Sequence, residues 1–151
     1  MTSASLVYPH QLFDRHPALR VGQPVLLVED PLYFGTDPRW PLAVHKQRLV
    51  LHRASMKAWA AGQGNLRYIE APERGIGSVD LLEREVPAAS RRIEVADPCD
   101  AVLSKRLRRF ATGREAVAPP HDGAEGSEEK DNPSSHHAHQ GTGASADGGS
   151  G

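Results

Sequence analysis

Residues 25–52 read VLLVEDPLYFGTDPRWPLAVHKQRLVLH, and this stretch decides the fold. It begins with the apolar run Val25 to Val28, which is typical of a strand that is buried on both faces. The run ends at Glu29, Asp30 and a proline, passes two aromatic residues and leads into a segment with helical spacing. A strand, a loop that contains acidic and aromatic residues, and then a helix together predict one unit of a parallel α/β sheet.

Similar patterns on either side of this stretch extend the prediction along the chain. Short apolar, β-branched runs predict four strands, SLVYP at 5–9, PVLLVE at 24–29, LRYIEA at 66–71 and RRIEVA at 91–96. Helical spacing predicts helices over 41–62, 78–86 and 97–113, and the segment 11–22 is only long enough for a short or irregular helix. Strands that alternate with helices predict a small open parallel sheet, three layers thick, of about four to five strands.

Specific residues mark the faces and ends of these helices. Between 41 and 62, the residues His45, Leu49, His52, Met56 and Trp59 follow steps of four, three, four and three, which places them on one helix face. For the segment 78–86 we expect Ser78 to be the N-cap. For the segment 97–113 we expect Asp97 to cap the helix, Pro98 to take the first helical position, Asp100 to lie in the first turn and Gly113 to end the helix.

Composition divides the chain into one folded domain, residues 1–113, and a tail, residues 114–151. The whole chain has 18 basic and 19 acidic residues, but residues 114–151 contain seven acidic residues and only two basic ones. The tail, rich in acidic, His, Gly and Ser residues, has almost no large apolar residue, so we expect it to be disordered. Cys99 is the only cysteine, which excludes a disulfide framework and an all-cysteine metal or iron–sulfur site built from this chain alone.

Several function classes lack the motifs that they need. The chain has no signal-like N-terminus and no run of about 18 apolar residues, so we expect a cytoplasmic protein. No phosphate-binding glycine motif follows a strand, which disfavours NAD and ATP binding. A nucleophile elbow is also missing, and Cys99 has no histidine near it in the sequence, so a hydrolase is not supported.

Four segments carry a resemblance to a known family: YPHQLF after the first strand, VLLVEDPLYF, HKQRLVLHRASMKAWA and VADPCDAVLSKRL. Over about residues 4–112 this layout resembles the N-terminal domain of the photolyase-related branch of the cryptochrome and photolyase family, which includes the bacterial iron–sulfur (6-4) photolyases. Pro9 and His10 stand where the usual family pattern has Gly-Asp before Gln-Leu. The resemblance implies a Rossmann-like sheet that holds a light-harvesting antenna chromophore of lumazine type. It also implies that FAD, a 4Fe-4S cluster and the DNA lesion are bound by a separate helical domain.

The candidate antenna pocket lies at the carboxyl ends of the strands, where open parallel sheets bind ligands. Its predicted residues are His10, Gln11, Leu12, Glu29, Asp30, Leu32 and Tyr33. Gln11 offers a donor and an acceptor to the edge of a lumazine- or flavin-like ring, and the carboxylates can accept from ring N–H groups or ribityl hydroxyls. Leu12, Leu32 and Tyr33 can cover the ring faces. For Asp30 and Asp97 a second interpretation stays open, in which they only cap loops or helices.

The histidines are interpreted as structural. His45 and His52 are seven residues apart, which does not fit a shared metal site of the i, i+4 type, so packing with one satisfied nitrogen is the better interpretation. In the tail, His136, His137 and His139 are the alternative metal ligands, although unstructured histidine clusters bind metals without a functional consequence.

The favoured hypothesis is a truncated or split antenna-type domain of a photolyase-related protein. Such a domain is non-catalytic alone, docks onto a separately encoded helical FAD-binding half, and contacts DNA only through that partner. The family resemblance implies that the domain takes part in light-dependent DNA repair or light sensing. The chain length and the single cysteine argue against a complete repair enzyme. The remaining alternative is a free-standing α/β module that binds a small molecule or a partner without photochemistry.

Overall fold

The computed structural model of the chain describes residues 2–112 and 114–117. Within these residues the chain forms five strands and four helices. In chain order they are β1 (Thr2–Val7), β2 (Val25–Val28), α1 (Pro31–Phe34), α2 (Lys46–Ala61), β3 (Leu66–Ile69), α3 (Ser78–Glu85), β4 (Ser90–Val95), α4 (Ala101–Phe110) and β5 (Glu115–Val117).

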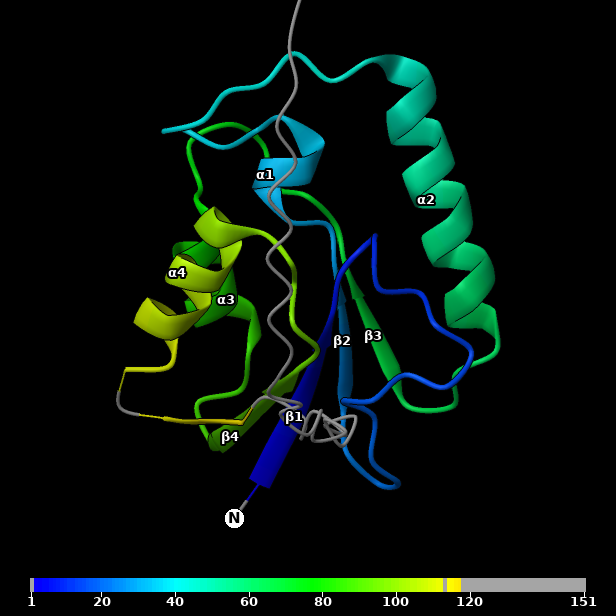
Figure 1. The fold of residues 1–151 in the computed structure, drawn as a ribbon, viewed down its shortest axis with the longest axis vertical. Helices are drawn as coiled ribbons and strands as arrows, with labels where there is room; N and C mark the ends of the chain where they lie inside the picture. The colour runs from blue at the N-terminus through cyan, green and yellow to red at the C-terminus, as the bar shows by residue number, and fades with distance from the viewer. Residues whose placement is uncertain (1, 113, 118–151) are drawn as a thin grey trace, which may run out of the picture. The chain divides into compact units, whose positions relative to one another are not determined.

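The strands form one parallel sheet in the order β3-β2-β1-β4-β5. The central strand is β1, whose Leu6 is in register with Leu26 of β2 and with Val95 of β4. Figure 1 shows α2 on one side of the sheet and α3 and α4 on the other, with α1 above the end of β2. The predicted open, parallel α/β sheet of four to five strands is therefore confirmed.

Alternate residues of the central strands supply two apolar clusters, because successive side chains of a strand point to opposite faces. Leu6, Leu26 and Val28 join the cluster that contains Leu82 of α3 and Leu103 of α4. The cluster on the other face consists of Val7, Val25, Leu27, Phe34 and Met56. All four residues of β2 are buried, as its unbroken apolar run predicts. Truncation of a leucine in such a cluster to alanine costs about 2 to 5 kcal/mol.

The predicted stripe of α2 is confirmed from Leu49 to Trp59, but the predicted start of the helix is wrong. His45 is exposed and precedes the helix, so the prediction that it packs on the stripe is wrong as well. Met56 is buried and Leu49 is half-buried on the stripe. The helix begins at Lys46 and not at Pro41, because the Nδ1 atom of His45 accepts the hydrogen bond that caps it. None of the helices in residues 2–112 and 114–117 is long and apolar enough to cross a membrane.

The start of α4 differs from the prediction as well. The N-cap is Asp100, which accepts a hydrogen bond from the Leu103 N–H at 2.8 Å. Cys99 has a positive φ of 51°, so helical geometry cannot run back through it to Pro98. Asp97 instead accepts a hydrogen bond from the Cys99 N–H at 2.9 Å, in the short turn that precedes the helix. The capping interpretation of Asp97 thus holds for a loop and is wrong for the helix.

Two further local predictions are wrong. The N-cap of α3 is Gly77, which has no side chain to cap the helix, whereas Ser78 is the first helical residue and its hydroxyl donates to Asp30. The segment 11–22 contains turns and no helix, and the sequence analysis missed α1, the single helical turn that Asp30 caps.

The fold continues beyond the predicted end of the domain at residue 113. The strand β5 pairs in parallel with β4, with Arg92 in register with Glu115. The residues 115–117 therefore belong to the sheet and not to the predicted tail, because the backbone groups of a strand form the ladder without needing large apolar side chains. The remaining part of the predicted disordered tail, 118–151, lies outside the described residues.

Candidate functional site

The carboxyl ends of β1 and β4 meet where the strand order reverses. The chain proceeds from β1 through β2 to β3 on one side and then places β4 on the other side of β1. Ligands of open α/β sheets bind in the crevice at such a position. His10 and Gln11 follow β1, while Glu29 and Asp30 follow β2. The fold thus brings four of the predicted site residues to this edge, which we call the carboxyl edge.

The side chains of His10 and Gln11 connect the end of β1 to the end of β4. Gln11 is buried, and its Nε2 donates to the carbonyls of Ala96 and Asp97 at 3.0 and 3.2 Å. The Nε2 of His10 lies 2.9 Å from the Pro98 carbonyl and donates to it. The Oε1 atom of Gln11 is buried and has no hydrogen-bond partner among the described residues. One acceptor at the crevice is therefore free.

Asp30 is fully buried, and only one of its two carboxylate oxygens has hydrogen-bond partners among the described residues. Its Oδ1 accepts from the Leu32 N–H at 3.0 Å and from the Ser78 hydroxyl at 2.8 Å. Its Oδ2 is buried without a partner in the described part of the chain. Burial raises the pKa of Asp30 to about 6, although the two hydrogen bonds and the nearby charge of Arg106 oppose the rise. Near neutral pH this group exists as both acid and carboxylate, so it can donate or accept.

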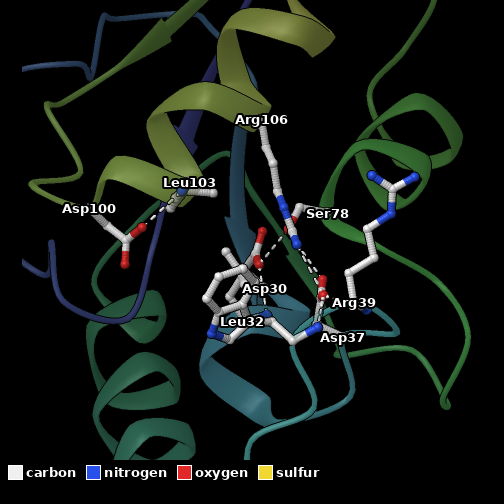
Figure 2. A network of polar contacts seen from close by, with 9 residues as sticks. Asp30, Leu32, Asp37, Arg39, Ser78, Asp100, Leu103 and Arg106 are labelled. Carbon is white, nitrogen blue, oxygen red and sulfur yellow. Dashed lines mark hydrogen bonds and ion pairs between the residues drawn. The ribbon is translucent and has the colours of Figure 1, made fainter.

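A chain of polar contacts fixes Asp30 in place (Figure 2). The Ser78 hydroxyl accepts from Arg106 Nη1 at 2.9 Å, and the same guanidinium forms a two-point ion pair with Asp37, its Nη2 lying 3.0 Å from Oδ1. Asp37 also accepts from the backbone N–H groups of Arg39 and Trp40, at 3.0 and 2.8 Å. The network joins α4 and α3 to the loop after α1, so Asp30 is held by three separate segments.

Two tyrosines lie beside this carboxylate. Tyr8 is fully buried at the end of β1, and its hydroxyl has no partner within the described residues. Burial first, and then the negative charge of Asp30, raise the pKa of Tyr8 well above its usual value. Burial, followed by the charges of Asp100 and Asp30, also raises the pKa of Tyr33. The His10 ring lies 5.0 Å from the Tyr33 ring and 6.3 Å from the Tyr8 ring, so an aromatic wall borders the edge.

Glu29 has a structural role. Its carboxylate accepts two bonds from Arg53, both at 2.8 Å, one from the Tyr68 hydroxyl at 2.6 Å and one from the Ala71 N–H at 2.9 Å. Burial acts to raise the pKa of Glu29, but the hydrogen bonds from Arg53, Ala71 and Tyr68 outweigh it and the pKa is lowered. This carboxylate joins α2 and the end of β3 to β2, and it has no acceptor capacity left over for a ligand.

The predicted apolar residues are divided between the two faces of the sheet. Leu32 is buried in the cluster under α3 and α4, whereas Leu12 packs against the cluster under α2. Tyr33 contacts both clusters and is half-buried. The Tyr33 ring also lies beside the His10 ring at the carboxyl edge.

Two further features bear on ligand binding, the metal-ligating side chains and a cavity. Within residues 2–112 and 114–117, no three His, Cys, Asp or Glu side chains are grouped so as to hold a metal ion. The alternative ligands His136, His137 and His139 lie outside the described residues. A cavity of about 380 Å³ lies at the opposite, amino edge of the sheet, where Ser3, Gln23 and Ser90 line it. It contains none of the predicted site residues.

Sequence reasoning missed Tyr8, Ser78, Asp37 and Arg106. A usable signal existed only for Asp37, since an Asp-Pro step indicates a turn that the aspartate closes. Tyr8 belongs to a strand that reads as core, Ser78 reads as a cap, and Arg106 belongs to a basic run that reads as a solvated helix face. The contacts of Arg106 with Ser78 and Asp37 join residues that are 28 and 69 positions apart, so no local pattern reports them.

Comparison with known proteins gives one match. The profile of a family described as Deoxyribodipyrimidine photo-lyase-related protein matches residues 5–120. The matched region is more than half of the 151 residues and contains every residue of the carboxyl edge. No curated protein and no solved structure matches the chain.

Proposed function

This chain belongs to the family of deoxyribodipyrimidine photo-lyase-related proteins, and we propose on that premise that residues 2–117 are an antenna-type domain that binds a flat chromophore at the carboxyl edge. The ligand class is a lumazine- or flavin-like ring, as the resemblance to the iron–sulfur bacterial branch implies. In this proposal the domain is not catalytic alone. A separately folded helical partner carries the FAD, any iron–sulfur cluster and the contact with DNA.

One observation supports the proposal above all others. Three buried polar atoms at the carboxyl edge have no partner among the described residues: the Tyr8 hydroxyl, Gln11 Oε1 and Asp30 Oδ2. A buried polar group without a hydrogen bond costs about 1 to 3 kcal/mol, so three at one edge require an explanation. A ring with alternating carbonyl and N–H groups can satisfy them, because Gln11 accepts, Tyr8 donates and Asp30 does either.

The way into the site depends on His10. This side chain is exposed, and its bond to the Pro98 carbonyl joins the loop after β1 to the loop after β4. The loss of one such hydrogen bond costs about 1 kcal/mol. A ligand can therefore displace the imidazole at small cost and then stack against it and Tyr33.

Exposed apolar side chains support the helical partner. Trp40 and Leu42, before α2, are 54% and 53% exposed, and Val50 and Leu51 on α2 are 67% and 65% exposed. Val50 and Leu51 are neighbours on α2, and large exposed apolar groups that lie together mark interaction sites more often than scattered ones do. Co-purification from the native host tests this part: a partner with a flavin spectrum is expected, and colourless protein without a partner contradicts it.

Titration of the purified chain with riboflavin and with a ribityllumazine tests chromophore binding directly. Fluorescence of the ligand reports the affinity, and we expect saturable one-to-one binding. Gln11→Met removes the free acceptor and is expected to weaken binding at least tenfold, equivalent to about 1.4 kcal/mol. Gln63→Met, the same substitution beyond the far end of α2, is the matched control. The absence of binding to both ring systems by folded protein would refute the proposal.

A further inference from the structure

The hydrogen bonds around Asp30 determine which of its two oxygens can hold a proton (Figure 2). Arg106 has only donor groups, so the Ser78 hydroxyl accepts from its Nη1 atom, at 2.9 Å. The single hydroxyl proton of Ser78 is then left for Asp30 Oδ1, 2.8 Å away. The backbone N–H of Leu32 also donates to Oδ1, at 3.0 Å. Oδ1 is therefore an acceptor whether Asp30 is ionised or neutral.

The proton of the neutral acid consequently lies on Oδ2. This oxygen is buried and has no hydrogen-bond partner in the described part of the chain. As part of a carboxylate it accepts a hydrogen bond, whereas in the protonated acid it donates one. Asp30 thus has one unpartnered atom whose hydrogen-bonding character changes with its protonation.

The other two unpartnered polar atoms of the carboxyl edge keep a fixed character. Both contacts of Gln11 Nε2 are carbonyls, those of Ala96 and Asp97, so the amide nitrogen faces them and Oε1 can only accept. Burial raises the pKa of Tyr8, so its hydroxyl keeps its proton and supplies a donor. Together the three atoms offer two donors and one acceptor when Asp30 is neutral, and one donor and two acceptors when it is ionised.

We propose that Asp30 Oδ2 sets the ring specificity of the site, and that Arg106 is the positioning residue that, through Ser78, keeps the exchangeable proton on this oxygen. The inference rests on the proposed function, which it makes more specific. The imide group of lumazines and flavins has two carbonyl acceptors and one N–H donor, and it complements the neutral acid. A 2-amino-4-oxo ring has an amino group in place of one carbonyl, and it complements the carboxylate.

The charged and titratable groups that face Asp30 leave it as the group that switches. Burial raises the pKa of Asp30 to about 6; the charge of Arg106 from α4 opposes the rise, and the charge of Asp37 adds to it. Burial also acts to raise the pKa of Asp37, but the hydrogen bonds and charge of Arg106 outweigh it, and the pKa is lowered. Tyr8 and Tyr33 face Asp30 from the end of β1 and from α1, and burial raises the pKa of both. Between pH 5 and pH 7.5, Asp37 therefore stays charged and both tyrosines stay neutral.

The decisive measurement is the ratio of two affinities as a function of pH. Lumazine and pterin are the matched probes, because they differ only at position 2, where lumazine has a carbonyl and pterin an amino group. The fluorescence of each ring reports its affinity for the purified chain. The ratio of the lumazine affinity to the pterin affinity should fall by about tenfold or more between pH 5 and pH 7.5, because the neutral acid becomes the minor form. Charge changes elsewhere at the edge, such as on His10, act on both probes and cancel. A ratio that stays constant or rises overturns the inference.

Asp30→Asn fixes the switching atom in its donor form. Both neighbours of Oδ1 donate, so the asparagine oxygen takes the place of Oδ1 and its amide nitrogen takes the place of Oδ2. The variant should prefer lumazine at both pH values, with a ratio within about threefold of the wild-type ratio at pH 5. Asp14→Asn, the same substitution at an exposed residue of the segment after β1, is the matched control and should keep the wild-type pH dependence. A ratio that still falls with pH in Asp30→Asn contradicts the assignment.

The positioning role of Arg106 is tested by the ratio at pH 5. In Arg106→Met the Ser78 hydroxyl is free to accept from a protonated Oδ1, so neutral Asp30 no longer keeps its proton on Oδ2 alone. The preference for lumazine should therefore drop by about threefold or more, and Arg106→Lys, which again supplies only donors, should restore most of it. Weaker binding of both probes with an unchanged ratio shows a structural role only and overturns this part. The wild-type and Asp30→Asn measurements test the selection by Oδ2 even if Arg106→Met does not fold.

The outcomes separate this inference from the proposed function. Binding of lumazine and pterin with a ratio that is independent of pH overturns the inference alone and leaves chromophore binding intact. Failure of both probes, riboflavin and the ribityllumazine to bind folded protein overturns the proposed function and this inference together.

Discussion

Asp30→Asn is expected to remove a pH dependence of stability that the burial of this carboxyl group imposes on the fold. The folded-state pKa of Asp30 is about 6, against an ordinary value of 3.8. A folded pKa above the unfolded one gives stability that is complete below about pH 4 and is lost as the pH rises through 6. The difference of about two pKa units corresponds to about 3 kcal/mol at neutral pH.

The asparagine keeps the acceptor that Leu32 N–H and the Ser78 hydroxyl use, and it has no charge to bury. The free energy of unfolding of the variant, minus that of the wild type, should therefore increase by about 2 to 3 kcal/mol between pH 4 and pH 7.5. Urea unfolding followed by tryptophan fluorescence measures both proteins. Other groups that titrate in this range cancel in the difference. A difference that stays constant within about 0.5 kcal/mol across the range would show that burial does not raise the pKa of Asp30.

Three more substitutions test the structure. Glu29→Gln should lower the free energy of unfolding by about 2 kcal/mol in urea melts at neutral pH, because Arg53 loses its charged partner; a loss below about 0.5 kcal/mol contradicts the clamp. Gly35→Ala should cost about 2 kcal/mol or more, seen as a lower thermal midpoint, because φ is 74° and the added Cβ overlaps the Leu42 carbonyl. Burial lowers the pKa of His16 to about 4, so this side chain should contribute a loss of about 2 kcal/mol as the pH falls from 7 to 4.5, opposite in sign to the contribution of Asp30; the free energy of unfolding of His16→Asn minus that of the wild type should rise by about that amount over this range, and a constant difference refutes the assignment.

The sheet and the longer helices could be predicted because their signals are local. The run Val25 to Val28 is apolar throughout, and the structure buries all of it. The helical spacing around Met56 placed the correct face of α2 toward the sheet. The signal for α1 was also present, since an aspartate followed by proline is typical of an N-cap and a first helical position. One turn was too short to stand out from the loop around it.

The roles of the two adjacent acids could not be predicted, because their partners lie far along the chain. Glu29 and Asp30 look equivalent in the sequence, yet the strand points them in different directions. Glu29 meets Arg53 and Tyr68, which lie 24 and 39 positions away, and is fully engaged. Asp30 meets Ser78, 48 positions away, and keeps one oxygen free. Because α2 and α3 pack on opposite faces of the sheet, Glu29 becomes a structural clamp and Asp30 a candidate ligand contact.

The position of β1 has a consequence for synthesis of the chain on the ribosome. Its two neighbours are parallel to it, so no hairpin can pair it early, and Thr2 is in register with Ser90 of β4. One edge of the central strand therefore stays open until about ninety residues have been made. A nascent chain with such an open edge can pair wrongly with other strands, so chaperones are expected to bind the chain until β4 emerges.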